Sequence, residues 1–183
     1  MQPWKRVEPT SFVKTAFRGI TTKSFQMPDG SVRQYDVFDE DGIQHACVIA
    51  LTSDNQVIIA EQFRPGPEKL MQEIPGGTID PDESPLTAVT RELLEETCYA
   101  PGTIEPLGVG YKDAYMNASW HYFLARNCVA VDQEQRLGAG EYVNIRLISI
   151  DEFLENAKNG CMTDGDAVLL AYDKLMELKG KIS

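Results

Sequence analysis

The sequence has few of the residues that build zinc sites or bind nucleic acids. It contains 4 cysteines and 2 histidines in 183 residues, and no two cysteines form a CxxC pair. A zinc knuckle or a thioredoxin-like site therefore has no support. Lys and Arg number 17 against 28 Asp and Glu, and the net charge of −11 repels phosphate backbones and anionic membranes. We expect neither a nucleic-acid partner nor a membrane partner, and any phosphate-bearing substrate needs local cations.

Long apolar segments are also missing. No stretch approaches the roughly 18 apolar residues that a membrane helix needs, and residues 1–15 contain no apolar run of signal-peptide length. We therefore expect a cytoplasmic protein. The content of 43% hydrophobic and 25% charged residues is typical of a globular domain.

The first forty or so residues differ from the rest by being more polar. Residues 20–38 place β-forming residues on both sides of Pro28-Asp29-Gly30, which predicts an antiparallel β-hairpin. A hairpin is too small to stand alone, so it must pack on the main domain or on another chain. We expect an N-terminal hairpin and dimerisation segment at residues 1–42 and a main domain at residues 43–183.

The main domain alternates strand-like and helix-like segments. Strands are expected at 45–51, 56–60, 70–74, 103–109, 119–125 and 142–148, and short helices at 149–158 and 167–178. A longer helix is expected at 85–97, with Ser84 as its N-cap and Pro85 in its first position. This order predicts an α+β fold in which helices cover the faces of a mixed sheet.

The helix expected at 85–97 carries an acidic cluster. Glu92, Glu95 and Glu96 lie within one turn, while Leu86 and Leu93 belong to the opposite, apolar face. Carboxylates at this spacing repel each other, and they lie in the half of the helix where the dipole also disfavours negative charge. A divalent cation such as Mg²⁺ would supply the missing positive charge. A solvated acidic face is the alternative.

The spacing around this cluster is specific. Gly77, Glu83 and the run Arg91–Glu96 match the pattern G-x5-E-x7-R-E-U-x-E-E-x-G-U, in which U is apolar. The chain thereby resembles the Nudix hydrolase family. Cys98 and Tyr99 depart from the last G-U of the pattern, which bears on the backbone after the helix and not on the carboxylates.

The resemblance implies a Nudix fold, an α/β/α sandwich with a mixed β-sheet between helices, and metal-assisted hydrolysis of a nucleoside diphosphate linked to another group. It also implies four ligands of Mg²⁺, for which Mn²⁺ can substitute: the Gly76 carbonyl, Glu92, Glu95 and Glu96. Glu95 also belongs to the implied catalytic set. Arg91 is implied to be structural, forming an ion pair with Glu83 that orients the glutamates.

Segments outside the pattern resemble those of the ADP-ribose and nucleoside diphosphate sugar pyrophosphatases. Glu61–Pro65 and Gln72–Gly77 carry this likeness, which implies that Arg64 binds a substrate phosphate. A surface ion pair is the alternative for Arg64. In that subfamily the N-terminal segment crosses to a partner subunit, so a homodimer is expected. Tyr35 and Phe17 are the implied nucleobase-stacking residues, and core or dimer packing is their alternative.

The subfamily takes its general base from a loop after the helix. Gly138–Ile145 is similar to the segment G-x-G-E-F/Y-V-x-V, which implies that Glu141 accepts the proton of the attacking water. Glu134 is the second candidate. An ordinary exposed loop glutamate is the alternative for both.

The expected substrate is broader than ADP-ribose alone. Lys112–Asn117 stands where dedicated ADP-ribose enzymes carry a proline, which favours a nucleoside diphosphate sugar hydrolase that releases a nucleoside monophosphate and a sugar phosphate. The alternatives are another Nudix substrate, namely coenzyme A, NADH, a dinucleoside polyphosphate or a nucleoside triphosphate, and a sensor module that binds nucleotide sugars without cleaving them.

Overall fold

The computed structural model describes residues 2–16 and 18–180, which form two compact units. Unit 1 comprises Met1–Gln44 and Tyr111–Ser119, and unit 2 comprises His45–Gly110 and Trp120–Ser183. No helix within the described ranges is both long and apolar enough to cross a membrane.

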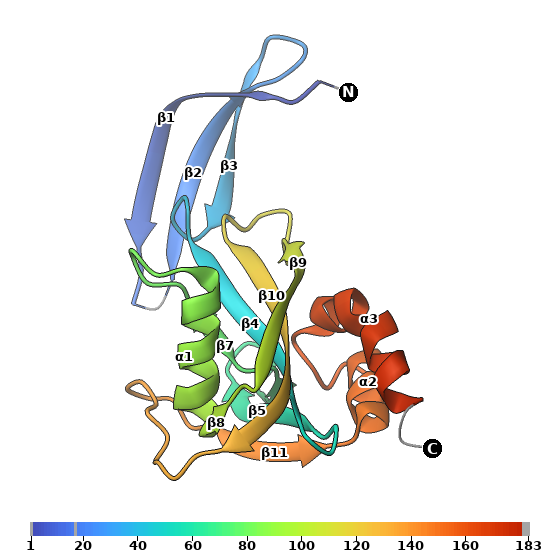
Figure 1. The fold of residues 1–183 in the computed structure, drawn as a ribbon. Helices are drawn as coiled ribbons and strands as arrows, with labels where there is room; N and C mark the ends of the chain where they lie inside the picture. Colours follow the sequence, from blue (N-terminus) through green and yellow to red (C-terminus); the bar gives the residue numbers. More distant parts are fainter. Residues whose placement is uncertain (1, 17, 181–183) are drawn as a thin grey trace. The chain divides into compact units, whose positions relative to one another are not determined.

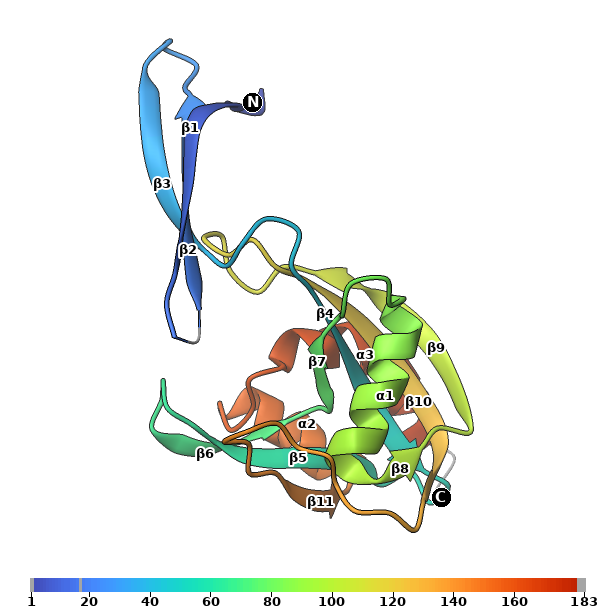
Figure 2. The ribbon, with the colours of Figure 1, turned by 90° about the vertical axis from the view of Figure 1, so that its left-hand side faces the viewer.

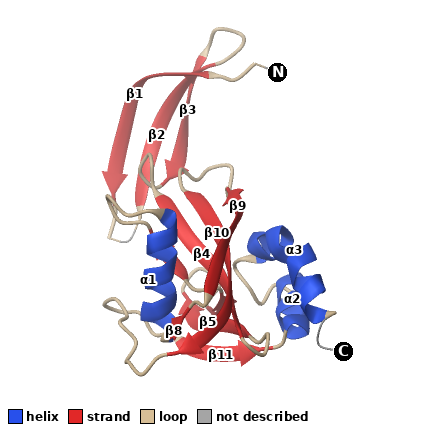
Figure 3. Cartoon of the chain, in the orientation of Figure 1, coloured by secondary structure: helices blue, strands red, loops and turns tan. Residues whose placement is uncertain are grey.

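Unit 1 is built on a three-stranded antiparallel sheet in the order β1-β2-β3 (Figure 3). Its strands are β1 Lys5–Lys14, β2 Gly19–Gln26 and β3 Val32–Phe38. The hairpin expected at residues 20–38 is confirmed, because β2 and β3 pair from Ile20↔Phe38 to Gln26↔Val32. The turn between them places Gly30 at φ 84°, in the left-handed region that glycine adopts without strain. β1 was not expected.

The segment Tyr111–Ser119 belongs to unit 1 although it is distant in sequence. The amide of Phe38 donates to the Tyr115 carbonyl at 2.7 Å, and the amide of Asn117 donates to the Phe38 carbonyl at 2.9 Å. The Asn117 side chain donates to the Asp39 carbonyl at 2.7 Å and accepts from Lys23. Backbone and side-chain bonds therefore hold this loop against the end of β3.

The larger sheet has eight strands in the path β11-β5-β4-β10-β8, with β6 paired to β5, β7 to β4 and β9 to β10. Its strands are β4 Gln44–Thr52, β5 Val57–Arg64, β6 Lys69–Glu73, β7 Gly76–Thr78, β8 Tyr99–Ala100, β9 Thr103–Gly110, β10 Ser119–Ala130 and β11 Asn144–Ile148. The very short strands β7 and β8 were not expected as separate strands.

Three helices cover the two faces of this sheet. α1 Pro85–Thr97 lies on one face, and α2 Ile150–Lys158 and α3 Gly165–Lys179 lie together on the other (Figures 1 and 2). The expected α/β/α sandwich is thereby confirmed. Ala88, Val89 and Leu93 of α1 pack into a buried cluster with residues of β4, β5 and β10.

The bounds of α1 follow from local chemistry. Ser84 accepts a hydrogen bond from the Thr87 amide at 3.1 Å, which satisfies a free N–H of the first turn, and Pro85 begins the helix. Val89 and Leu93 are buried, as expected for the apolar face. Leu86 is 46% exposed, so the expectation that it joins this face was wrong; the buried residues of α1 begin only at Ala88.

Candidate active site

Arg91 is the centre of an ion-pair network on α1. Its Nε and Nη2 donate to the two carboxylate oxygens of Glu83 at 3.1 and 2.9 Å, a bidentate arrangement. Its Nη1 donates to Glu92 at 2.8 Å and to Glu95 at 3.1 Å. The guanidinium lowers the pKa of Glu83 and is itself held charged by these carboxylates. One arginine thus connects the loop before α1 to two glutamates on the helix.

Glu92 and Glu96 lie in a partly buried position where negative charge is unfavourable. Burial, together with the neighbouring charges of Glu92 and Glu141, raises the pKa of Glu96 to about 8, although a hydrogen bond from the Gly76 amide at 3.0 Å opposes the rise. Burial also raises the pKa of Glu92, and the Arg91 guanidinium opposes that rise. The two carboxylates therefore need a cation close by to be ionised together.

The glycines of β7 allow the helix carboxylates to approach the sheet. β7 pairs with β4 through Cys47↔Gly76 and Ala46↔Gly77. A Cβ on Gly77 would lie 2.4 Å from Glu92 Oε1, and a Cβ on Gly76 would lie 2.4 Å from the Ala46 carbonyl oxygen. Only glycine fits at position 76, where the close atoms belong to the backbone of β4, whereas a side chain at position 77 would displace the carboxylate of Glu92.

Glu141 lies in the exposed loop before β11. Its side chain accepts a hydrogen bond from the Gly138 amide at 2.7 Å, and its own amide donates to the Gly138 carbonyl at 3.1 Å. Its charge acts on both Glu92 and Glu96, so it lies within electrostatic reach of them. Glu134 is exposed, and its charge is not one of the main influences on the pKa values of those two carboxylates.

Arg64 lies at the end of β5 and is paired across the hairpin to β6. Its Nε donates to Glu73 Oε1 at 2.6 Å, and its Nη2 bonds to the other carboxylate oxygen. Gln62 donates to the same carboxylate at 3.2 Å. Glu73 is buried, whereas the Arg64 side chain is 44% exposed. Glu73 therefore fixes one edge of the guanidinium and leaves a large part of the side chain open to solvent.

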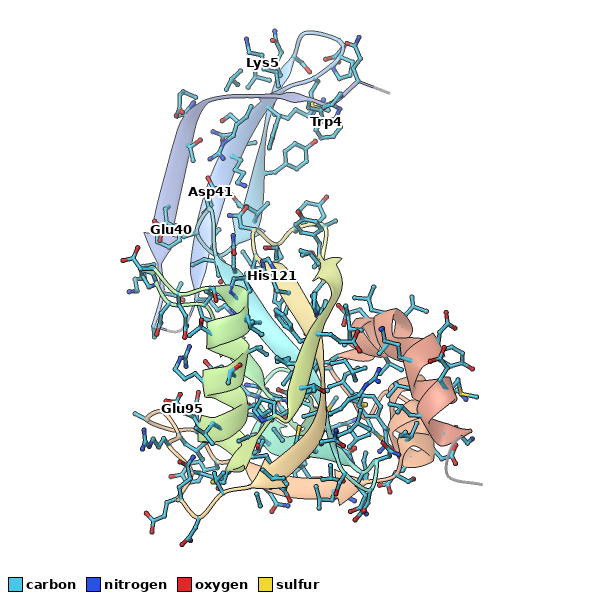
Figure 4. The ribbon with its side chains drawn as sticks, viewed as in Figure 1. Trp4, Lys5, Glu40, Asp41, Glu95 and His121 are labelled. Atoms are coloured by element: carbon cyan, nitrogen blue, oxygen red, sulfur yellow. The ribbon has the colours of Figure 1, made fainter. Side chains whose placement is uncertain are left out.

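The implied nucleobase-stacking residues lie in the N-terminal part of the chain. Tyr35, on β3 of unit 1, stacks on Trp4 with ring centroids 5.7 Å apart and an interplanar angle of 28°. Phe25 meets both rings edge-on. Figure 4 labels Trp4, one member of this cluster, and Glu95 on α1. Phe17 lies outside the described residues.

Comparison with known proteins identifies the family. A sequence model described as the NUDIX domain matches residues 43–169. The chain belongs to the NUDIX domain family.

Named relatives extend this match over most of the chain. The methanol dehydrogenase activator of Bacillus methanolicus is 27% identical over 176 residues, which are 93% of this chain and 94% of the relative. The ADP-ribose pyrophosphatase of Bacillus subtilis (strain 168) is 25% identical over 160 residues, 86% of this chain and 85% of the relative. A crystal structure of an ADP compounds hydrolase has the same fold, with a TM-score of 0.79 at 16% identity over 99% of this chain and 97% of that one. As a family member, the chain is a Nudix pyrophosphohydrolase.

Nudix hydrolases generally use divalent metals, and the oxygen donors near Glu96 suit such an ion. Carboxylates whose pKa values rise through burial and mutual repulsion are the groups that a hard cation stabilises. Among the described residues, however, no three Asp, Glu, His or Cys side chains are grouped closely enough to hold a metal ion. Arg91 binds Glu92 and Glu95 instead, so metal binding requires these carboxylates to turn away from the guanidinium.

Cys98 fills the role of the glycine that the Nudix pattern has at this position. It follows α1 with φ 59° and ψ 28°, in the left-handed region, and its amide donates to the Leu94 carbonyl at 3.0 Å. This is the conformation that favours glycine at the end of a helix. The helix end is therefore formed despite the substitution, at the cost of placing a side chain at positive φ.

Three polar residues that the sequence reasoning did not single out contact either Arg64 or the C-terminal end of α1. Glu73 holds Arg64, and Gln133 and Gln135 bind carbonyl oxygens at the end of α1. In the sequence, Glu73 was covered only by the resemblance of the Gln72–Gly77 segment to the subfamily, without a role of its own. The two glutamines carried no signal, because their partners are backbone atoms more than thirty residues away.

Proposed function

We propose that the chain hydrolyses the pyrophosphate bond of nucleoside diphosphate sugars of the ADP-ribose, ADP-glucose or GDP-mannose type, with Mg²⁺, to a nucleoside monophosphate and a sugar phosphate. The observation that carries this proposal is the group of carboxylates Glu92, Glu95 and Glu96 on α1, of which the first two bond to Arg91 and the third accepts from the Gly76 amide. The Bacillus subtilis relative named ADP-ribose pyrophosphatase supports the substrate class.

Each group of the chain has a distinct task in this reaction. Glu92, Glu95, Glu96 and the Gly76 carbonyl hold Mg²⁺, with Mn²⁺ as a substitute. When bound there, such an ion would neutralise the pyrophosphate and lower the pKa of a water molecule. The oxygen of one water bonds to a phosphorus atom, the bridging P–O bond breaks, and Glu141 takes the proton from the water. Glu83 holds the Arg91 guanidinium by a bidentate ion pair, so its positive charge stays beside the helix carboxylates when they turn toward the ion.

The substrate-binding part of the proposal depends on Arg64 and on the N-terminal unit. The exposed part of Arg64 binds a substrate phosphate while Glu73 keeps its guanidinium oriented. Tyr35 and Phe17 stack on the nucleobase. The active form is a homodimer through the N-terminal segment, and sedimentation that detects only a fully active monomer of about one chain mass, 20.4 kDa, would contradict this.

A second candidate function is activation of a dehydrogenase. It is suggested by the relative named methanol dehydrogenase activator, to which the chain is similar over almost its whole length. In that case the chain would act by changing the activity of a partner dehydrogenase. The carboxylate set is the same in both cases, so we expect cleavage of a nucleotide substrate with or without a partner. Adding the chain to a dehydrogenase assay, with and without the Glu96→Gln change, separates the two.

The test is product analysis with Mg²⁺ and a panel of ADP-ribose, ADP-glucose, GDP-mannose, UDP-glucose, NADH, coenzyme A and nucleoside triphosphates. We expect nucleoside monophosphate from the diphosphate sugars, and at least about 1000-fold less with Glu96→Gln, because metal-assisted stabilisation is worth several kcal/mol. Glu155→Gln is the matched control, since Glu155 is an exposed residue of α2 paired only loosely with Lys158 at 3.9 Å.

The outcomes of this panel are distinct. Cleavage of another panel member alone would keep the Nudix chemistry and overturn the nucleotide-sugar assignment. Tight binding of a nucleotide sugar without turnover of any compound would favour the sensor module.

A further inference from the structure

The segment that leads to the Glu141 loop is anchored on the C-terminal end of α1. The last carbonyl groups of a helix have no partner within the helix. Here the Gln133 side chain donates to the Leu94 carbonyl at 3.1 Å, and the Arg136 amide donates to the Glu95 carbonyl at 2.9 Å. The Gln135 side chain donates to the Glu96 carbonyl at 2.5 Å. Three consecutive carbonyls of α1 thus accept from residues 133–136.

Gln135 differs from the other two because it also reaches the far side of the Glu141 loop. Its Nε2 donates to the Val143 carbonyl at 3.3 Å, in addition to the Glu96 carbonyl. A side-chain amide nitrogen carries two hydrogens, so one Nε2 can serve both acceptors at once. Gln135 is therefore a bridge between Glu96 on α1 and Val143, the residue directly before β11 and two residues beyond Glu141.

The bridge closes a short loop. Residues 136–142 lie between the two attachment points, and Glu141 is inside that interval. Within it, the side chain of Glu141 and the backbone of Gly138 bond to each other in a tight turn. The position of the Glu141 carboxylate relative to Glu92 and Glu96 is consequently constrained by the bridging amide, by the bond of the Arg136 amide to Glu95 and by the turn at Gly138.

We propose that Gln135 is a positioning residue for the hydrolysis, which holds the Glu141 loop at the distance from Glu96 that proton transfer requires. This inference rests on the proposed function, in which Glu141 is the general base. Gln135 acts through the position of Glu141 and touches no reacting atom. Displacement of a catalytic group by about 1 Å can cost a hundredfold in rate, so loss of one bridge is sufficient to matter.

The test compares Gln135→Met with Gln133→Met. Each change replaces a glutamine by an apolar residue of similar length and removes one side-chain hydrogen bond to a carbonyl at the end of α1. Only Gln135 also bonds to Val143. For Gln135→Met we expect kcat to fall roughly 10- to 100-fold, as for loss of other supporting residues of a site. KM should change by less than about threefold, because substrate contacts remain. For Gln133→Met we expect kcat within about twofold of the parent protein.

Two further measurements separate positioning from a general loss of structure. In a Glu141→Gln background, Gln135→Met should lower kcat no further, since the base it positions is already gone. Amide hydrogen exchange of residues 137–143 should accelerate in Gln135→Met and stay unchanged in Gln133→Met. Both glutamine variants should lose a similar, small amount of thermal stability, since each loses one hydrogen bond at the helix end.

The results overturn the inference if Gln135→Met keeps the parent kcat, if Gln133→Met lowers kcat equally, or if Gln135→Met has the same effect with and without Glu141. If the unaltered protein cleaves no panel member, the proposed function falls and the catalytic role of Gln135 falls with it. Hydrogen exchange still tests in that case whether Gln135 anchors the loop. Equal exchange rates of residues 137–143 in the two glutamine variants would show that it does not.

Discussion

The two sheets of the molecule bury their residues in opposite ways. In unit 2, residues 46–51 of β4 have exposed fractions between 0% and 7%. In unit 1, β1 has no buried residue, and Val13, Val32 and Phe38 are 62%, 58% and 50% exposed. Among the described residues of unit 1, no large apolar side chain is buried. One sheet therefore has its own core and the other does not.

The difference separates two sources of stability. β4 and β5 lie between α1 on one side and α2 and α3 on the other, so burial of apolar surface holds unit 2 together. Unit 1 depends on backbone pairing between its strands and on ion pairs such as Arg6–Asp41 and Arg18–Asp39. Exposed ion pairs are worth little each. The carboxylate array belongs to the unit with the rigid core, as accurate placement of charged groups requires.

The largest effect is expected from a substitution in the core of unit 2, and it concerns the free energy of unfolding. Leu93 of α1 is fully buried, and Leu93→Ala should lower the free energy of unfolding by about 3–5 kcal/mol through lost burial and a cavity. Val13→Ala in β1 should change it by less than about 0.5 kcal/mol, because Val13 is exposed. Thermal and denaturant unfolding measure both. Equal effects of the two changes would mean that the sheet of unit 1 is covered by apolar surface in solution.

The second effect concerns the chemistry that unit 2 carries. Glu141→Gln should lower kcat at least about 100-fold with little change in substrate affinity, because a neutral amide cannot take the proton of the attacking water. Glu134→Gln removes an equal charge from the same region and is the control. A normal rate in Glu141→Gln together with a slow one in Glu134→Gln would move the general base to Glu134.

Local signals in the sequence were enough to predict the helix of the site. Ser84 and Pro85 mark its start through capping and backbone geometry, which act over a few residues. The Arg91–Glu83 pair was implied by the resemblance of this segment to the Nudix pattern, and both residues lie on or next to one helix. Elements and contacts of this kind depend on short-range geometry.

Features that depend on distant parts of the chain could not be predicted in the same way. β1 carries Pro9 and lacks buried residues, so its sequence has no alternating apolar signal. The attachment of residues 111–119 to β3 and the bridge made by Gln135 use backbone acceptors far away in sequence. A backbone carbonyl has no residue type, so nothing in the printed sequence distinguishes Gln135 from any other loop glutamine.

The smallest expected effect tests whether unit 1 contributes to substrate binding. Tyr35→Ala should raise KM by about tenfold and leave kcat unchanged, because base stacking on an aromatic ring is worth roughly 1–3 kcal/mol and takes no part in bond breaking. Tyr35→Phe keeps the ring and is the control, while Trp4→Ala removes its stacking neighbour at 5.7 Å. Steady-state kinetics with the best nucleotide sugar measures all three. A fall in kcat at constant KM would contradict a stacking role. If instead all three variants keep the parent KM, the Trp4–Tyr35 pair serves only to stiffen a sheet that has no core of its own, and the division of labour is complete: unit 2 alone would then bind and cleave.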